Sequence, residues 1–140
     1  MKKIVATVSA SLLLTFSFVQ PIFASSYNTT LTMSGGTYQY MSNNWRKFDG
    51  ESVSMSMTLK TSGCKYSSNS DVRLRASLYR KNFLGSSYIS YRTYAPGSNS
   101  KKWANVGSGK YCWSFEKKCG DELDRLYYAA CKSSDIVMSD

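Results

Sequence analysis

The 140-residue chain contains no histidine, only two prolines and only nine acidic residues. Histidine is the commonest general base, the base of serine triads and a frequent metal ligand, so its absence excludes most such sites. A secreted hydrolase would need paired carboxylates or an activated nucleophile, and we find neither arrangement. The sequence therefore predicts a non-enzymatic protein with no catalytic residue, no cofactor and no metal site.

A long hydrophobic run is also missing. The only extended apolar segment, residues 4–19, follows Lys2 and Lys3 and is shorter than the roughly 20 residues needed to span a bilayer. Small residues follow the helix-breaking Pro21, which is typical of a secretory signal peptide covering residues 1–24. Cleavage after either Ala24 or Ser26 fits, and a retained anchor is the alternative. We expect a secreted, extracellular protein whose single domain spans residues 27–140.

Four cysteines, all in the part expected outside the cell, predict two disulfide bonds. They are Cys64, Cys112, Cys119 and Cys131. Zinc sites use closely spaced pairs of cysteines, commonly with histidine, whereas the gaps here are 47, 6 and 11 residues. Spacing alone leaves the pairing of the four cysteines open.

Alternating apolar and polar residues indicate β-strands over much of the chain. Residues 52–61 place Val53, Met55, Met57 and Leu59 on one face, against serine, threonine and lysine on the other. Turn signals recur about every ten residues, as in all-β domains. The sequence predicts an antiparallel two-sheet β-sandwich of seven or eight strands, with a small closed barrel as the alternative.

Three local features refine this prediction. Gly35-Gly36 lies between two alternating runs and suggests a tight hairpin. Tyr111, Trp113 and Phe115 alternate with Cys112, so we expect the aromatic rings in the core and Cys112 on the opposite face; exposed rings are the alternative. Residues 121–132 have helical spacing and predict one short C-terminal helix, followed by a last strand at 135–139.

Positive charge is concentrated in the middle of the chain. The formal net charge is +9, or +7 once Lys2 and Lys3 leave with the signal peptide. Residues 46–118 contain fourteen Lys and Arg but four acids, whereas five acids follow between 119 and 140. Such a protein attracts polyanions, although the charge could serve solubility alone.

The hairpin expected at residues 71–95 is the best candidate binding surface. Matching its apolar faces allows a register with Arg75 opposite Arg92, but two like charges would then oppose each other. We therefore expect the register shifted by two, with Arg75 opposite Tyr94 and Ser77 opposite Arg92. Guanidinium groups bind phosphate or carboxylate, and tyrosine rings offer flat apolar area. The alternative is that tyrosine suits strands and arginine keeps an edge soluble. The candidate binding residues are Arg73, Arg75, Tyr79, Tyr88, Arg92 and Tyr94, with Lys101 and Lys102 on the next strand.

These features favour a secreted protein that binds an anionic extracellular surface, either a cell-wall polymer or membrane headgroups. An antimicrobial, bacteriocin-like role against neighbouring cells would fit the same features. The alternative is a protein-binding module, such as an inhibitor or immunity factor, acting through the loops at 81–87, with Phe83-Leu84 at its tip, or 95–103. Nucleic acid could bind the same residues, but the secreted compartment argues against it.

Overall fold

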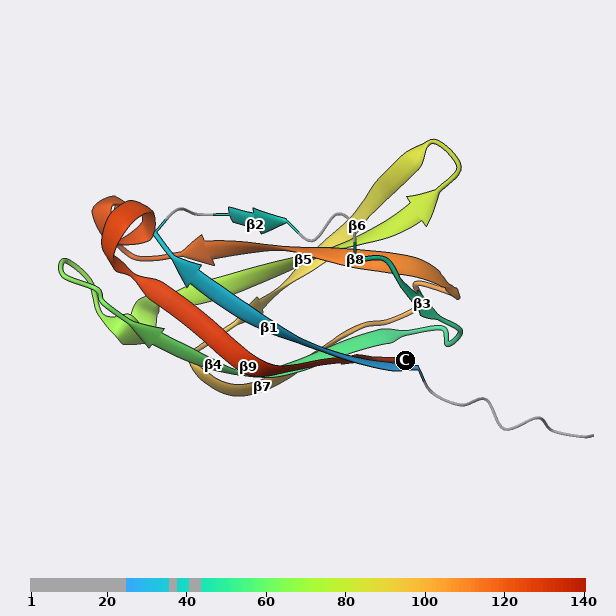
Figure 1. Cartoon of the computed structure of the whole chain (residues 1–140), viewed down its shortest axis with the longest axis horizontal. Coiled ribbons are helices and arrows are strands. Elements are labelled where there is room, and N and C mark those ends of the chain that lie inside the picture. Colours follow the sequence, from blue (N-terminus) through green and yellow to red (C-terminus); the bar gives the residue numbers. More distant parts are fainter. Residues whose placement is uncertain (1–24, 36–37, 41–43) are drawn as a thin grey trace, which may run out of the picture.

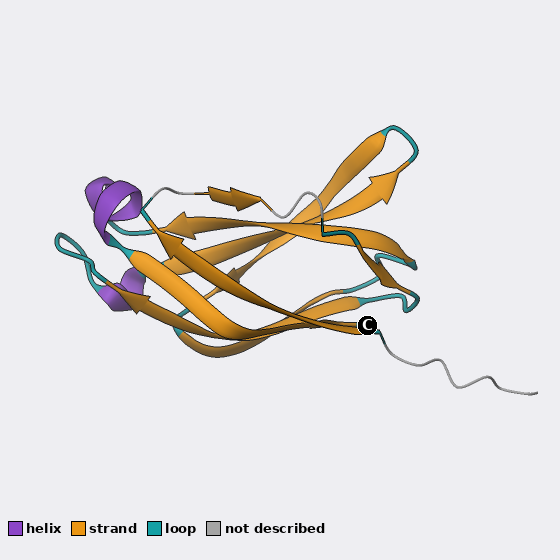
Figure 2. Ribbon diagram, in the orientation of Figure 1, coloured by secondary structure: helices purple, strands orange, loops and turns teal. Residues whose placement is uncertain are grey.

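The computed structural model describes residues 25–35, 38–40 and 44–140, so the predicted signal peptide and Gly36 lie outside the described residues. Two antiparallel sheets pack face to face as a β-sandwich and do not close into a barrel (Figures 1 and 2). The prediction of fold class is therefore confirmed.

The first sheet, called the β4 sheet, has four strands. In spatial order they are β1 (Ser26–Ser34), β9 (Ala130–Ser139), β4 (Val53–Ser62) and β7 (Gly97–Trp103). The second, called the β8 sheet, has the order β2 (Tyr38–Tyr40), β8 (Gly109–Lys118), β5 (Arg73–Asn82) and β6 (Gly85–Tyr94). The short β3 (Arg46–Phe48) also pairs with β8. Two short helices, η1 (Asn69–Asp71) and η2 (Asp124–Tyr128), lie at one end of the sandwich (Figure 2).

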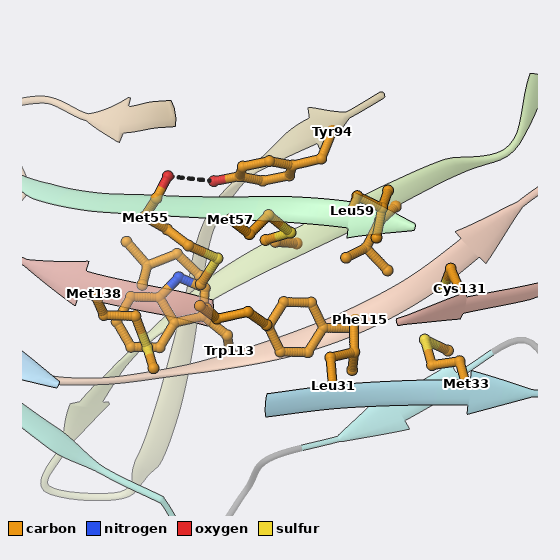
Figure 3. Close-up of a cluster of buried hydrophobic side chains, with 14 of the residues drawn as sticks. Leu31, Met33, Met55, Met57, Leu59, Tyr94, Trp113, Phe115, Cys131 and Met138 are labelled. Carbon is orange, nitrogen blue, oxygen red and sulfur yellow. Dashed lines mark hydrogen bonds between the residues drawn. The ribbon is translucent and has the colours of Figure 1, made fainter. Parts of the chain in front are cut away.

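The core lies between the sheets, and its residues are those that the alternation predicts. Val53, Met55, Met57 and Leu59 of β4 are all buried, while the serines between them are half-buried. From β8, Trp113 and Phe115 point into the same interior (Figure 3). A strand exposes alternate residues to opposite faces, so an apolar residue at every second position suffices to form one side of this core.

Side chains also join the two sheets near β6 and β7. The buried hydroxyl of Tyr94 donates to the carbonyl of Met55 at 3.2 Å (Figure 3). The indole of Trp103 donates to the carbonyl of Ser90 at 3.3 Å. These two bonds run from one sheet to the other and fix the position of β6 against β4 and β7.

Three predictions of detail were wrong. The strands beside Gly35 do not form a hairpin, because β1 pairs with β9 and β2 pairs with β8, in different sheets. The described residues contain nine strands rather than seven or eight. The predicted helix is confined to Asp124–Tyr128, and β9 starts at Ala130, because Cys131 pairs with both Met33 and Thr61 in the neighbouring strands. Strand pairing on both sides outweighs the weak helical preference of this segment.

The four cysteines are free thiols, which corrects the prediction of two disulfides. Cys112 is buried in β8 opposite Tyr79, and burial raises its pKa to about 11. Cys119 follows the end of the same strand, and an extended chain separates the two by roughly 20 Å. Cys119 lies near Cys64 and Cys131. Burial is the main cause that raises the pKa of the Cys119 thiol, and the positive charge of Lys117 acts in the opposite direction. The spacing of the cysteines along the sequence does not reveal that Cys112 lies apart from the other three.

Candidate binding surface

The outward face of the β8 sheet is the surface where the sequence places the binding residues. The observed register of β5 and β6 pairs Arg75 with Thr93 and Ala76 with Arg92, which differs by one residue from the predicted register. A bulge lies between Leu78 and Tyr79, whose partners are Ser90 and Tyr88, so that Ile89 is the extra residue. A one-residue change moves side chains to the opposite face of a strand.

The bulge decides which predicted residues share this face. Arg73, Arg75, Tyr79 and Tyr88 lie on it, as predicted. Tyr94 does not, because it is fully buried in the core, where burial raises its pKa far above the usual value. Tyr91 takes the outward position instead, with the Arg75 guanidinium 4.2 Å from its ring centroid.

Arg92 was also assigned to the wrong face. It shares the inward side of β6 with Tyr94, and its Nε donates to the carbonyl of Lys102 at 2.9 Å. Its guanidinium lies 5.6 Å from the Trp103 ring centroid. Arg92 therefore joins the edges of the two sheets and is not part of an outward binding face.

Lys101 and Lys102 belong to the other sheet. Both lie in β7, opposite Met55 and Ser54 of β4, and both are exposed. They are available to an anion, but not beside the arginine and tyrosine side chains of β5.

The arginines are largely occupied by contacts within the protein. Arg75 contacts Glu116 at 3.5 Å as well as Tyr91. Arg73 donates to the carbonyls of Ser70 and Val72 and so holds η1 against β5. Arg80, which the sequence did not single out, donates to the carbonyls of Val106 and Ser108. A guanidinium held against backbone oxygens keeps a fixed orientation, so it cannot follow an external anion as a flexible ammonium group can.

The lysines behave differently. In the described part of the chain, most of their ammonium groups have no hydrogen-bond or ion-pair partner. These are Lys60, Lys65, Lys81, Lys101, Lys102, Lys110 and Lys132. Most carboxylates, in contrast, accept bonds from within the protein, and among the described residues only Glu51 and Asp71 lack such a partner. The net positive charge therefore resides mainly in solvent-accessible lysines.

Lysines meet on the outward face of the β8 sheet. Lys47 of β3 lies directly opposite Lys110 of β8. Lys81 directly follows Arg80, whose pairing with Tyr111 is the last between β5 and β8. Extending this register by one residue brings Lys81 to Lys110 on the other side of β8. We call these three residues the lysine row. The Lys81 ammonium lies 5.8 Å from the ring centroid of Trp45, and only Lys47 has an acidic partner, Asp49. Like charges directly opposite each other cost energy unless an anion lies between them.

A second pair of opposed lysines, Lys60 and Lys132, lies on the outward face of the β4 sheet. They border a hollow of about 350 Å³ that is also lined by Thr30, Thr32 and Ser133. Sequence reasoning missed both lysine pairs. No local pattern could have revealed them, because each is made by strands distant in the sequence.

A further hollow, of about 480 Å³, lies on the same outward face. Five of its eight lining residues carry a hydroxyl or amide group, and Asp135 is its sole carboxylate. The Ser133 hydroxyl and the Thr58 amide, both donating to Asp135, lower its pKa to about 2. This hollow brings no second carboxylate beside Asp135.

Within the described ranges, no group of three or more cysteine, aspartate or glutamate side chains could hold a metal ion, and no helix is long and apolar enough to cross a membrane. Comparison with known protein families found no family model that matches the chain, and comparison with curated proteins found no matching sequence.

Proposed function

We propose that this is a secreted, non-enzymatic protein that binds an anionic extracellular surface through its free lysines, with the lysine row as the principal contact. The observation that carries this proposal is the contrast between the lysines, which are mostly unpaired, and the other charged groups. Arginines and carboxylates are mostly paired inside the protein, whereas Lys81 and Lys110 have no polar partner.

Lysine suits contact with an extended anionic surface. Its ammonium is a mobile point charge on a flexible stem, so it can follow phosphates or carboxylates that have no fixed geometry. Seven net positive charges in the mature chain, following from +9 with Lys2 and Lys3 removed, would steer the protein toward such a surface. A bacteriocin-like action on neighbouring cells is one outcome of such binding.

The test is co-sedimentation with isolated bacterial cell walls and with anionic lipid vesicles across a salt series. The lysine-row variant carries Lys81→Gln and Lys110→Gln. A matched variant, Lys101→Gln with Lys102→Gln, removes the same charge from β7 on the other sheet. At about 1 kcal/mol per lysine near an anionic surface, the lysine-row variant should bind roughly 10- to 30-fold more weakly at low salt.

We expect a smaller loss for the β7 variant and weaker binding of all forms as salt rises. Absence of pelleting with either surface at the lowest salt would overturn the proposal. Equal losses for the two variants would overturn the assignment of the lysine row and leave only overall charge as the cause.

A further inference from the structure

The tip of the β5–β6 hairpin carries the most exposed apolar side chains of the described residues. Phe83 is 100% exposed and Leu84 92%, whereas the next most exposed large hydrophobic residue, Tyr127, reaches 67%. The hairpin extends beyond the body of the sandwich, so its tip stands clear of the other strands (Figure 1). No part of the described chain covers these two side chains.

The tip has a defined turn. The Leu84 amide donates to Oδ1 of Asn82 at 3.1 Å, and Nδ2 of Asn82 donates to the Ser87 hydroxyl at 2.6 Å. Gly85 has φ 142°, a conformation that favours glycine. Phe83 and Leu84 are thus presented on an ordered turn, and binding need not pay for ordering the loop.

The base of the hairpin is fixed and cationic. Both terminal nitrogens of Arg80 donate to carbonyls of the β7–β8 loop, at 3.2 Å to Val106 and 2.7 Å to Ser108. Lys81 and Lys110 lie behind the tip on the outward face. Residues 72–115, which include the whole hairpin, contain eight Lys and Arg and no acid.

An apolar tip backed by cations matches the boundary of an anionic bilayer. Apolar rings and aliphatic chains gain free energy in the layer just below the headgroups, and lysines reach back to the phosphates. Hydrated wall polymers offer no apolar layer in which Phe83 and Leu84 could be buried. The partly buried Trp45 beside Lys81 is of the residue type that favours the membrane interface.

We propose that the β5–β6 hairpin inserts Phe83 and Leu84 into the headgroup boundary of an anionic lipid bilayer, while Lys81 and Lys110 contact lipid phosphates. This inference rests on the proposed function and names the lipid bilayer as its surface. It gives the hairpin two separable contributions, one from apolar burial and one from charge.

The experiment measures binding of the full mature chain to vesicles of phosphatidylcholine alone and of equal parts phosphatidylcholine and phosphatidylglycerol. Replacing Phe83→Ser and Leu84→Ser together should weaken binding to the anionic vesicles by about 10- to 100-fold, because even partial burial of each side chain is lost. Matched controls are Leu123→Ser and Tyr127→Ser, two exposed apolar positions at the opposite end of the molecule. We expect these controls to bind like the wild type.

A second readout reports insertion directly. The Leu84→Trp variant should show a blue-shifted emission, relative to the wild-type background, when anionic vesicles are added, and lipid-borne bromine should quench it. Equal binding by the tip variant, or an unshifted and unquenched signal from the introduced indole, would overturn the inference.

The two proposals can fail separately. Salt-sensitive pelleting with cell walls but not with vesicles would overturn lipid insertion and leave anionic-surface binding intact. A tip variant that keeps vesicle binding would overturn insertion and leave a protein as the occupant of the Phe83–Leu84 tip. Loss of all pelleting at low salt would overturn both.

Discussion

The two ends of the sandwich in Figure 1 differ in how they hold charge. At the end that carries η2, a carboxylate and an ammonium group are fully buried, whereas at the opposite end Phe83, Leu84 and Lys81 are exposed. We call these the helix end, comprising η2, residues 62–71 and residues 117–119, and the hairpin end, comprising residues 80–87, 45–49 and 107–110. Asp124 and Lys117 belong to the first, and Phe83 and Lys81 to the second.

At the helix end, each buried charge has partners. Asp124 accepts bonds from the amides of Lys65, Tyr66 and Ser67, at 2.7, 3.0 and 2.7 Å, and from the Ser67 hydroxyl at 2.8 Å. Lys117 donates to the carbonyl of Ala129. These bonds tie the 62–71 loop and the end of η2 to the sheets. The difference teaches that the buried charges serve stability at the helix end, whereas the ammonium groups of Lys81 and Lys110 at the hairpin end are left available for binding.

The largest difference in stability between the two ends should follow from replacing a glycine at each end by alanine. Gly63 and Gly85 both have positive φ, but a Cβ at Gly63 would lie 2.4 Å from the Tyr128 carbonyl oxygen, while nothing lies near a Cβ at Gly85. We expect Gly63→Ala to lower the free energy of unfolding by about 2–4 kcal/mol and Gly85→Ala by about 1 kcal/mol. Urea denaturation of both variants measures this difference. Equal losses of stability in the two variants would mean that the helix end is no more tightly packed around Gly63 than the hairpin end is around Gly85.

The next effect is a pH dependence located at the helix end. Burial alone would raise the pKa of Asp124, but hydrogen bonds from Lys65, Ser67 and Tyr66 outweigh it and lower the pKa to about 2. Stability from this group is therefore present above its ordinary pKa of 3.8 and is lost as pH falls from about 4 toward 2.

The Asp124→Asn variant should unfold several degrees lower than wild type at neutral pH and should lose part of the acid dependence. Asp71→Asn is the control, because the exposed Asp71 carboxylate accepts no hydrogen bond from the described residues. Thermal unfolding between pH 2 and 7 makes the comparison. If the unfolding temperature of Asp124→Asn falls with pH in parallel to that of the wild type, Asp124 is not a source of the acid dependence.

Substitutions at the hairpin end should barely change stability. Phe83→Ser and Lys81→Gln alter side chains with little or no buried contact, so each should shift the free energy of unfolding by no more than about 0.5 kcal/mol. The same urea titration measures them beside Gly63→Ala. A loss of several kcal/mol would show that the hairpin tip supports the fold and would weaken its assignment to binding.

The smallest effect should be that of a reductant. Because all four thiols are free, adding dithiothreitol should leave the thermal midpoint unchanged. A bridge at the helix end, where Cys64, Cys119 and Cys131 lie, would instead contribute about 2–5 kcal/mol, and its reduction would lower the midpoint markedly. Mass spectrometry after alkylation without reductant gives an independent count of thiols.

Several elements of the fold could be predicted from local pattern. The alternation in 52–61 identified β4 and its buried face, and the aromatic alternation placed Tyr111, Trp113 and Phe115 in the core. Cys112 does face away from that core, but it is buried on its own side. Local pattern succeeds here because successive side chains of a strand point to opposite faces, so every second residue is buried.

The candidate site was predicted only in part. The sequence placed four residues on the correct face, namely Arg73, Arg75, Tyr79 and Tyr88. It placed Arg92 and Tyr94 on the wrong face, because the bulge opposite Leu78 and Tyr79 reverses which residues of β6 point outward. The exposure of Phe83 and Leu84 was left open by the sequence, since the same pair could have folded back under the hairpin.

The sequence by itself determined most of the strand-forming segments, the apolar core and the excess of positive charge, because each depends on composition or on neighbours one or two residues apart. Only the tertiary structure decided the pairing of β1 with β9, the opposition of Lys47 and Lys110, and the separation of Cys112 from the other thiols. These features arise where distant strands meet, and their register is set by bulges and by packing of the two sheets together.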